Sequence, residues 1–187
     1  MIILASKSPR RRDILEMLEL KYRCAPADTD ETLIEGMSPA DTVMLFSQRK
    51  ARAVKDEAEN GDVILGMDTM VCIDGVLLGK PADEADAFRM LKALSGKAHN
   101  VVTGYTVIYG DKEETGCVST DVYFRTLSDD EINWYISTGE PMDKAGAYGI
   151  QGKGSLFVDS IDGDYFSVLG FPVCRVFEVV KKLTNVK

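Results

Sequence analysis

The chain has 187 residues, of which 45% are hydrophobic and 28% are charged, and its net charge is −8. This length and composition predict one globular domain (1–187) with a sizeable core and exclude a disordered chain. No apolar run approaches the roughly 18 residues of a membrane span, and Met1 leads into an apparent strand instead of a signal peptide. We therefore expect a cytoplasmic protein that does not bind membranes. Because an acidic surface repels nucleic-acid backbones, we also expect no binding to nucleic acid.

Strand and helix patterns alternate along the chain, with serine-proline pairs at 8–9 and 38–39 at the start of the first two helices. The expected order is strand 1–6, helix 9–20, strand 22–26, polar loop 27–36, helix 39–59, hairpin 62–73 and 76–79, helix 83–94, hairpin 99–110 and 116–127, helix 129–138, glycine-rich segment 144–154, strand 155–161 and helix 171–183. Interleaved helices and hairpins predict an α/β fold with a mixed sheet flanked by helices.

The four cysteines at positions 24, 72, 117 and 174 lie far apart and mostly in apolar stretches. We interpret them as reduced core residues and not as a zinc site or a disulfide framework.

Basic residues are concentrated near the start of the chain. Residues 1–25 contain six Lys or Arg and three acids, whereas residues 26–43 contain five acids and no Lys or Arg. Helical spacing puts Arg11 on the apolar stripe, Arg10 at its margin and Arg12 on the solvent side with Glu16. Arginines at a helix start oppose the helix dipole. We therefore expect Arg10 and Arg11, with the free N–H groups of the helix start and the hydroxyls of Ser6 and Ser8, to form an anion site. A solvated basic first turn is the alternative.

Asp68 is the strongest single signal, because it interrupts the apolar run "VILGMDTMVCI" at 63–73. A buried acid binds a metal, pairs with a base or transfers protons. The alternative is an edge-strand aspartate that faces water.

Two lysines are weaker candidates. Lys50 is in register with the apolar face of the second predicted helix, so that it either extends past that face into solvent or binds phosphate. Lys80 precedes Pro81 after the first hairpin, where a fixed turn can direct it toward a cleft.

The segment "KAGAYGIQGKG" at 144–154 has four glycines, which permit a close approach of the backbone to a ligand. It is not a P-loop, because that motif requires glycine at 147 and Ser or Thr at 154, where the chain has Ala147 and Gly154. Gln151 could read a base edge or brace the loop. His99, the only histidine, has apolar neighbours and is expected to be structural.

Several of these segments together resemble the Maf family of nucleoside triphosphate pyrophosphatases over essentially the whole chain. They are "LASKSPRR" (4–11), "DTDET" (28–32), "RKARAV" (49–54), "LGMDTMV" (65–71), "LGKP" (78–81), "LSGKAHNVVTG" (94–104) and "GEPMDKAGAYGIQG" (139–152). The resemblance implies an elongated mixed sheet in two lobes around a cleft, similar to the inosine triphosphatase architecture, and it makes a homodimer an expected state.

The resemblance also implies roles for individual residues. Asp68 matches the catalytic acid or base, and Glu31 matches a nearby acidic residue. We expect Asp68, with Glu31, to hold a divalent cation, Mg²⁺ or Mn²⁺. The residues that match substrate-binding positions are Ser8, Arg10, Arg11, Lys50, Thr69, Lys80, Lys144 and Gln151. Of these, Arg10, Thr69 and Gln151 match positions tied to substrate choice.

The form "KAGAYGIQG" is similar to the branch of the family that acts on dTTP and UTP. We therefore expect hydrolysis of these nucleotides to the monophosphate and pyrophosphate. The 7-methyl-GTP branch and a non-catalytic, nucleotide-binding regulator of cell division are the alternatives.

Overall fold

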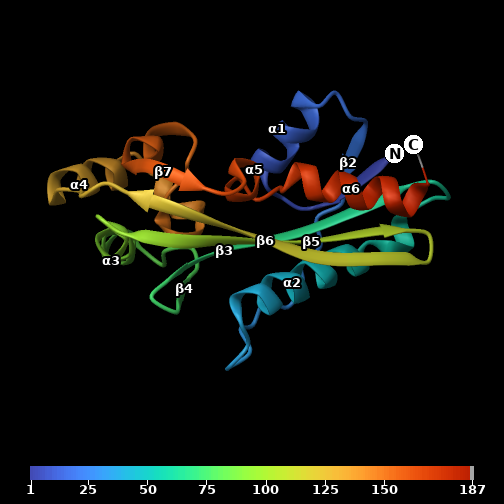
Figure 1. Ribbon diagram of the computed structural model, residues 1–187, viewed down its shortest axis with the longest axis horizontal. Coiled ribbons are helices and arrows are strands. Elements are labelled where there is room, and N and C mark those ends of the chain that lie inside the picture. The colour runs from blue at the N-terminus through green and yellow to red at the C-terminus, as the bar shows by residue number, and fades with distance from the viewer. Residues whose placement is uncertain (186–187) are drawn as a thin grey trace. The chain divides into compact units, whose positions relative to one another are not determined.

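The computed structural model describes residues 1–185 as a seven-stranded mixed sheet with helices on its faces (Figure 1). The strands are β1 (Ile2–Ala5), β2 (Tyr22–Cys24), β3 (Val63–Ile73), β4 (Val76–Leu78), β5 (Ala98–Tyr109), β6 (Lys112–Phe124) and β7 (Val158–Asp162). They are ordered β2-β1-β3-β5-β6-β7, and β4 pairs with β3. β1 is parallel to β2 and β3, whereas the β3–β4 and β6–β7 pairs are antiparallel. The predicted mixed α/β sheet is therefore confirmed.

The helices alternate with the strands largely in the predicted order. They are α1 (Pro9–Met17), α2 (Pro39–Ala53), α3 (Glu84–Leu94), α4 (Asp129–Ser137), α5 (Tyr165–Val168) and α6 (Val173–Thr184), with short 3-10 helices η1 (Lys55–Glu57), η2 (Glu140–Asp143), η3 (Ala145–Ala147) and η4 (Gly152–Phe157). None of the helices in residues 1–185 has the length and apolar character needed to cross a membrane.

The chain divides into two compact units. Unit 1 comprises residues 1–68, 103–118 and 170–187, of which the structure describes those up to 185, and unit 2 comprises residues 69–102 and 119–169. The division falls within β3, β5 and β6, so each of these strands contributes residues to both units. The two predicted lobes correspond to these units, while the cleft and the elongated form stay predictions.

Unit 1 has helices on both faces of its strands: α1 and α6 lie over one face and α2 over the other (Figure 1). Ser38 caps α2, because its hydroxyl accepts a hydrogen bond from the backbone N–H of Asp41 at 3.1 Å. Ala51 of α2 belongs to the same buried cluster as Ile3 of β1 and Ile64 of β3. This packing fixes the helix that carries Lys50 against the strand that carries Asp68.

Unit 2 contains α3, α4, α5, β4, β7 and the glycine-rich segment. The capping box of Ser128 and Glu131 begins α4. Two fully buried side chains, Tyr135 and Phe157, meet edge to face with ring centroids 5.0 Å apart. The core of unit 2 therefore packs α4 against η4, the 3-10 helix that includes the last residues of the glycine-rich segment.

Some local predictions were wrong. Helix α1 ends at Met17 and not near residue 20, because Glu19 adopts a left-handed backbone with φ 54°. Helix α2 ends at Ala53 and is followed by a separate 3-10 turn. All four cysteines are free, as expected, but Cys24 and Cys174 are exposed and are not core residues.

Candidate active site

Two glycines bring α2 against the sheet more closely than any other residue would allow. A Cβ added at Gly66 of β3 would lie 2.8 Å from the Cβ of Ala51, and one added at Gly104 of β5 would lie 2.7 Å from the backbone nitrogen of Met44. Both distances are shorter than real Cβ contacts, so a side chain at either position would displace the helix. Because alternate residues of a strand share a face, Asp68 lies on the same side of β3 as Gly66, toward α2.

This close packing joins Lys50 to two carboxylates. The Nζ of Lys50 lies 2.5 Å from Oδ1 of Asp68 and 2.8 Å from Oε1 of Glu31. The side chains of Lys50 and Asp68 are only 13% and 11% exposed, whereas that of Glu31 is 54% exposed. The ammonium group is therefore enclosed on the Asp68 side and open to solvent on the Glu31 side.

The cluster decides two questions that the sequence left open. Asp68 is buried and paired with a base, so the alternative of an edge-strand aspartate facing water is wrong. The alternative in which Lys50 extends past the apolar face of its helix into solvent is wrong as well, because its side chain is 13% exposed and its ammonium group contacts Asp68. Its predicted role as a phosphate ligand stays a prediction.

Arg11 is the buried cation of α1, as its place on the apolar stripe predicts. Its Nε donates to the carbonyl oxygen of Gly170 at 2.7 Å and its Nη1 to Oγ of Ser6 at 2.9 Å. Burial lowers the pKa of Arg11 to about 10, with Asp68 and Glu31 acting against the shift and Arg10 adding to it. The guanidinium is still protonated at neutral pH, so the carboxylates of the Lys50 cluster have a second cation nearby.

The neighbours of Arg11 follow the predicted helical spacing. Arg10 is half-buried and Arg12 is exposed. Ser8 occupies the N-cap position, but its side chain makes no capping hydrogen bond; its backbone N–H donates to Oγ of Ser6 at 3.2 Å. Glu16, the expected partner of Arg12, instead accepts a hydrogen bond from the hydroxyl of Tyr22 at 2.7 Å.

In unit 2 the structure brings together the segments that carry Lys80 and Lys144. The backbone N–H of Gly146 donates to the carbonyl oxygen of Gly79 at 3.0 Å, one residue before Lys80. Gly146 has a left-handed backbone (φ 68°), and a Cβ there would lie 3.0 Å from the side chain of Val71. The glycine therefore permits the close approach of the two segments.

The predicted binding residues of unit 2 differ in exposure. Lys80 and Gln151 are exposed and Thr69, which directly follows Asp68, is half-buried. Lys144 is largely buried, and its Nζ donates to the carbonyl oxygen of Glu140 at 2.7 Å and to Oδ1 of Asp143 at 2.6 Å. Their roles toward a ligand stay predictions.

Sequence reasoning missed the two side chains that hold the glycine-rich segment. The carboxylate of Glu140 accepts hydrogen bonds from the backbone N–H groups of Lys153 and Gly154 and from the hydroxyl of Tyr135. A signal for Glu140 was present, since it lies in the quoted "GEPMD" directly before the segment. No local pattern marks Tyr135, which reads as an ordinary core position of its helix.

His99 is structural, as predicted. It is 3% exposed, its Nε2 shares a hydrogen bond of 2.8 Å with the hydroxyl of Tyr148, and its ring stands edge to face against Phe124. Nδ1 has no hydrogen-bond partner among the described residues. Burial lowers the pKa of His99 to about 4, so the imidazole is neutral at physiological pH.

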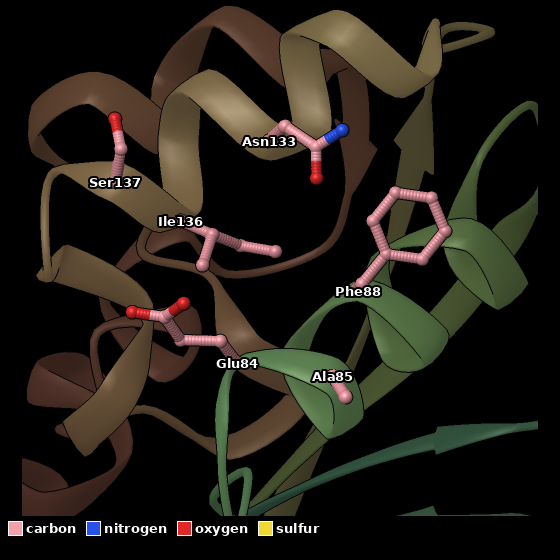
Figure 2. Close-up of a pocket in the computed structure, with 6 residues that line it drawn as sticks. All are labelled: Glu84, Ala85, Phe88, Asn133, Ile136 and Ser137. Atoms are coloured by element: carbon pink, nitrogen blue, oxygen red, sulfur yellow. The ribbon is translucent and has the colours of Figure 1, made fainter.

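A separate groove lies in unit 2 between α3 and α4 (Figure 2). Figure 2 shows Phe88 of α3 and Ile136 of α4 on facing helices, with Asn133 beside them. Its other lining residues are Glu84, Ala85 and Ser137. None of the site residues predicted from the sequence lines this groove, so it is not the candidate active site.

Asp68 and Glu31 of unit 1 are the residues predicted to hold a divalent cation. No group of three or more His, Cys, Asp or Glu side chains suited to a metal occurs in the part of the chain that the structure describes. Glu31 and Asp68 nevertheless converge on one cation, the Nζ of Lys50. One or two carboxylates, completed by waters and substrate phosphates, are the usual protein share of a Mg²⁺ site. Two carboxylates of this kind are compatible with Mg²⁺ or Mn²⁺, and the ion itself stays a prediction.

The fold and the site define a class of mixed α/β proteins in which a buried aspartate of the sheet pairs with a lysine of a neighbouring helix, near a buried arginine. Comparison with known proteins is more specific, and the chain belongs to the family described as Maf-like protein, whose model matches residues 1–183.

Two curated relatives match over nearly their full lengths. A protein of Bacillus velezensis named dTTP/UTP pyrophosphatase is 49% identical over 187 residues, which cover 100% of this chain and 97% of the relative. A protein of Thermococcus onnurineus with the same name is 50% identical over 185 residues, covering 98% and 96%. Among solved structures, the Ham1 protein of Staphylococcus aureus matches with 13% identity and a TM-score of 0.46 over 66% of this chain and 71% of that one. The likeness to the inosine triphosphatase architecture stays a prediction.

Proposed function

We propose that this chain is a nucleoside triphosphate pyrophosphatase that hydrolyses dTTP and UTP to the monophosphate and pyrophosphate. The observation that carries the proposal is the identity of about half of all residues, over the whole chain, with proteins named dTTP/UTP pyrophosphatase. The geometry of unit 1 supports it, because Asp68, Lys50 and Arg11 supply the acid and the cations that phosphoryl chemistry requires.

In the proposed reaction, water attacks the α-phosphorus, the bond from that phosphorus to the α–β bridging oxygen breaks, and pyrophosphate leaves. Asp68 would accept the proton of the attacking water, the general-base role that its match to the family implies. A divalent cation held by Asp68 and Glu31 would neutralise phosphate charge. Lys50 can exchange its carboxylate partners for a phosphate oxygen, because its ammonium group has three rotatable donors.

The other residues are assigned on the family resemblance. Ser8, Arg11, Lys80 and Lys144 would contact the triphosphate, whereas Arg10, Thr69 and Gln151 would set the choice of nucleotide. For Arg11 the structure adds a constraint: two of its donor nitrogens already bind Ser6 and Gly170. It therefore contributes a fixed positive charge, and its orientation does not depend on the ligand.

The test measures pyrophosphate release from dTTP, UTP, CTP, GTP and 7-methyl-GTP with Mg²⁺ or Mn²⁺ present, for the wild type and for Asp68→Asn. We expect preferential release from dTTP and UTP, and a loss of at least about a hundredfold in Asp68→Asn, as is typical for a general base. Asp159→Asn, an exposed position in β7, is the matched control and should retain wild-type activity. Wild-type turnover by Asp68→Asn would refute the assignment of Asp68.

The same panel separates the alternatives. Preference for 7-methyl-GTP would place the chain in the other branch, and the absence of pyrophosphate release from every nucleotide would favour the non-catalytic regulator of cell division. A homodimer, a cytoplasmic location and the lack of nucleic-acid binding stay predictions from the sequence.

A further inference from the structure

The glycine-rich segment of unit 2 is closed around a single carboxylate. Glu140 accepts hydrogen bonds from the backbone N–H of Lys153 at 3.1 Å and from that of Gly154 at 3.2 Å. Gly152 has a left-handed backbone (φ 74°), and a Cβ there would lie 3.0 Å from both carboxylate oxygens. Burial of Glu140 acts against its ionised form, but these two backbone donors and the hydroxyl of Tyr135 outweigh it and hold the pKa of Glu140 below its ordinary value. The loop is therefore built against a permanent negative charge.

Tyr135 holds the other end of the same loop. Its hydroxyl donates to Oε1 of Glu140 at 3.0 Å and accepts a hydrogen bond from the backbone N–H of Gly149 at 3.2 Å. Its ring is fully buried against Phe157. The position of the hydroxyl is thus set by core packing and does not depend on the loop.

Between these two anchors stands Gln151. The backbone is tied at Gly149 on one side and at Lys153 on the other, and Gln151 lies between them with an exposed side chain. Lys144 at the start of the segment is held separately, since its Nζ donates to the backbone carbonyl oxygen of Glu140 and to Oδ1 of Asp143. The Glu140 carboxylate and the Tyr135 hydroxyl therefore determine where the glutamine amide is presented.

We infer that Tyr135 and Glu140 are positioning residues that set nucleotide choice by fixing the backbone on both sides of Gln151. The inference rests on the proposed function, in which Gln151 reads the nucleotide. An amide discriminates between bases only when its donor and acceptor are held in register with the base edge. A loop released at either anchor would present the amide in several orientations, so that favoured and disfavoured nucleotides would be bound more equally.

The test compares Tyr135→Phe and Glu140→Gln with the wild type. Tyr135→Phe keeps the buried ring and removes both hydrogen bonds of the hydroxyl. Glu140→Gln keeps the shape of the side chain and replaces one of its two acceptor oxygens with a donor. The matched controls are Tyr123→Phe and Asp159→Asn, two exposed positions in the same unit.

The readout is the ratio of kcat/KM for dTTP or UTP to kcat/KM for CTP and GTP, with kcat and KM determined separately. We expect each loop variant to lower this ratio about tenfold through a higher KM for dTTP and UTP, the effect of losing a well-formed hydrogen bond. The kcat should change less, because Asp68 and Lys50 are untouched. The controls should keep the wild-type ratio.

A ratio is chosen because it does not depend on the fraction of enzyme that is folded. If Tyr135 and Glu140 only stabilised the fold, the variants would lose activity equally on all nucleotides and keep the wild-type ratio, which would overturn the inference. If Tyr135→Phe fails to fold, as judged by circular dichroism, Glu140→Gln decides alone. A wild-type enzyme that releases no pyrophosphate from dTTP or UTP would refute the proposed function instead, so the two failures are distinguishable.

Discussion

Lys50→Met tests the ion-pair cluster of unit 1, because methionine keeps an unbranched side chain of similar length and removes the ammonium group. In the wild type, the ammonium group lies 2.5 Å from Asp68 and 2.8 Å from Glu31. Its removal leaves a largely buried aspartate without the lysine that pairs with it, next to a second carboxylate.

The expected cost follows from burial. Removing one partner of a buried ion pair typically costs about 3–5 kcal/mol. The lower end applies here, because the Glu31 side chain is 54% exposed and Arg11 supplies a second positive charge near Asp68. A loss of about 3 kcal/mol in the free energy of unfolding corresponds to a melting temperature lower by roughly 6–12 °C in a protein of this size.

The assay is thermal and urea unfolding of the wild type, Lys50→Met and Lys55→Met. Lys55 is 48% exposed and its carboxylate neighbour Asp111 is 4.0 Å away, so its removal should change stability by no more than about 0.5 kcal/mol. The double variant with Asp68→Asn should recover most of the loss, since the unpaired charge is then absent. Equal stability of the two lysine variants would refute the reasoning.

Added Mg²⁺ extends the same experiment to the proposed metal site. If Asp68 and Glu31 bind the cation, Mg²⁺ should raise the melting temperature of Lys50→Met more than that of the wild type, because the ammonium group no longer competes for the carboxylates. An equal shift in both proteins would count against these two ligands.

Two further predictions concern Arg11 and His99. Arg11→Ala should destabilise the fold by about 1–3 kcal/mol, because it leaves the buried carbonyl of Gly170 without its donor, and it should also impair pyrophosphate release. The exposed control Arg12→Ala should be nearly silent. Equal effects of the two substitutions on urea unfolding and turnover would contradict this. Burial lowers the pKa of His99 from 6.5 to about 4, so between these pH values the imidazole binds a proton in the unfolded chain but not in the folded one. The free energy of unfolding should therefore fall by about 2 kcal/mol from pH 7 to pH 5 because of this residue. His99→Gln should lack that part of the pH dependence in urea titrations, and an unchanged slope would show that the imidazole is not the cause.

Periodicity and capping residues predicted most of the elements, because these signals are local. The caps at Ser38 and Ser128 show this, since both hydroxyls accept the backbone hydrogen bonds that start their helices. Boundaries without such a signal were missed: α1 ends at a left-handed Glu19, which no glycine or proline announces. The four-residue α5 is too short for its periodicity to be recognised.

The candidate site was also predictable only where the signal is local. The burial of Asp68 was predictable, because the apolar residues on both sides of it in the strand are a local signal. The cost of burying an unpaired carboxylate also predicted that it would have some partner. Its pairing with Lys50 could not be predicted, since it depends on the close approach that Gly66 and Gly104 allow between α2 and two strands. The brace on the glycine-rich segment is also a tertiary contact, and the sequence reveals only the glycines that make room for it.

The strand order has a consequence for behaviour at high concentration. β2 and β7 end the sheet, and each leaves one row of backbone groups that a strand of another molecule could pair with. β2 is only three residues long, and β7 carries exposed acids at Asp159 and Asp162. A short strand offers few hydrogen bonds to an incoming chain, and two aspartates repel a second copy of themselves. The ends of the sheet are therefore protected against edge-to-edge aggregation by length at one end and by charge at the other.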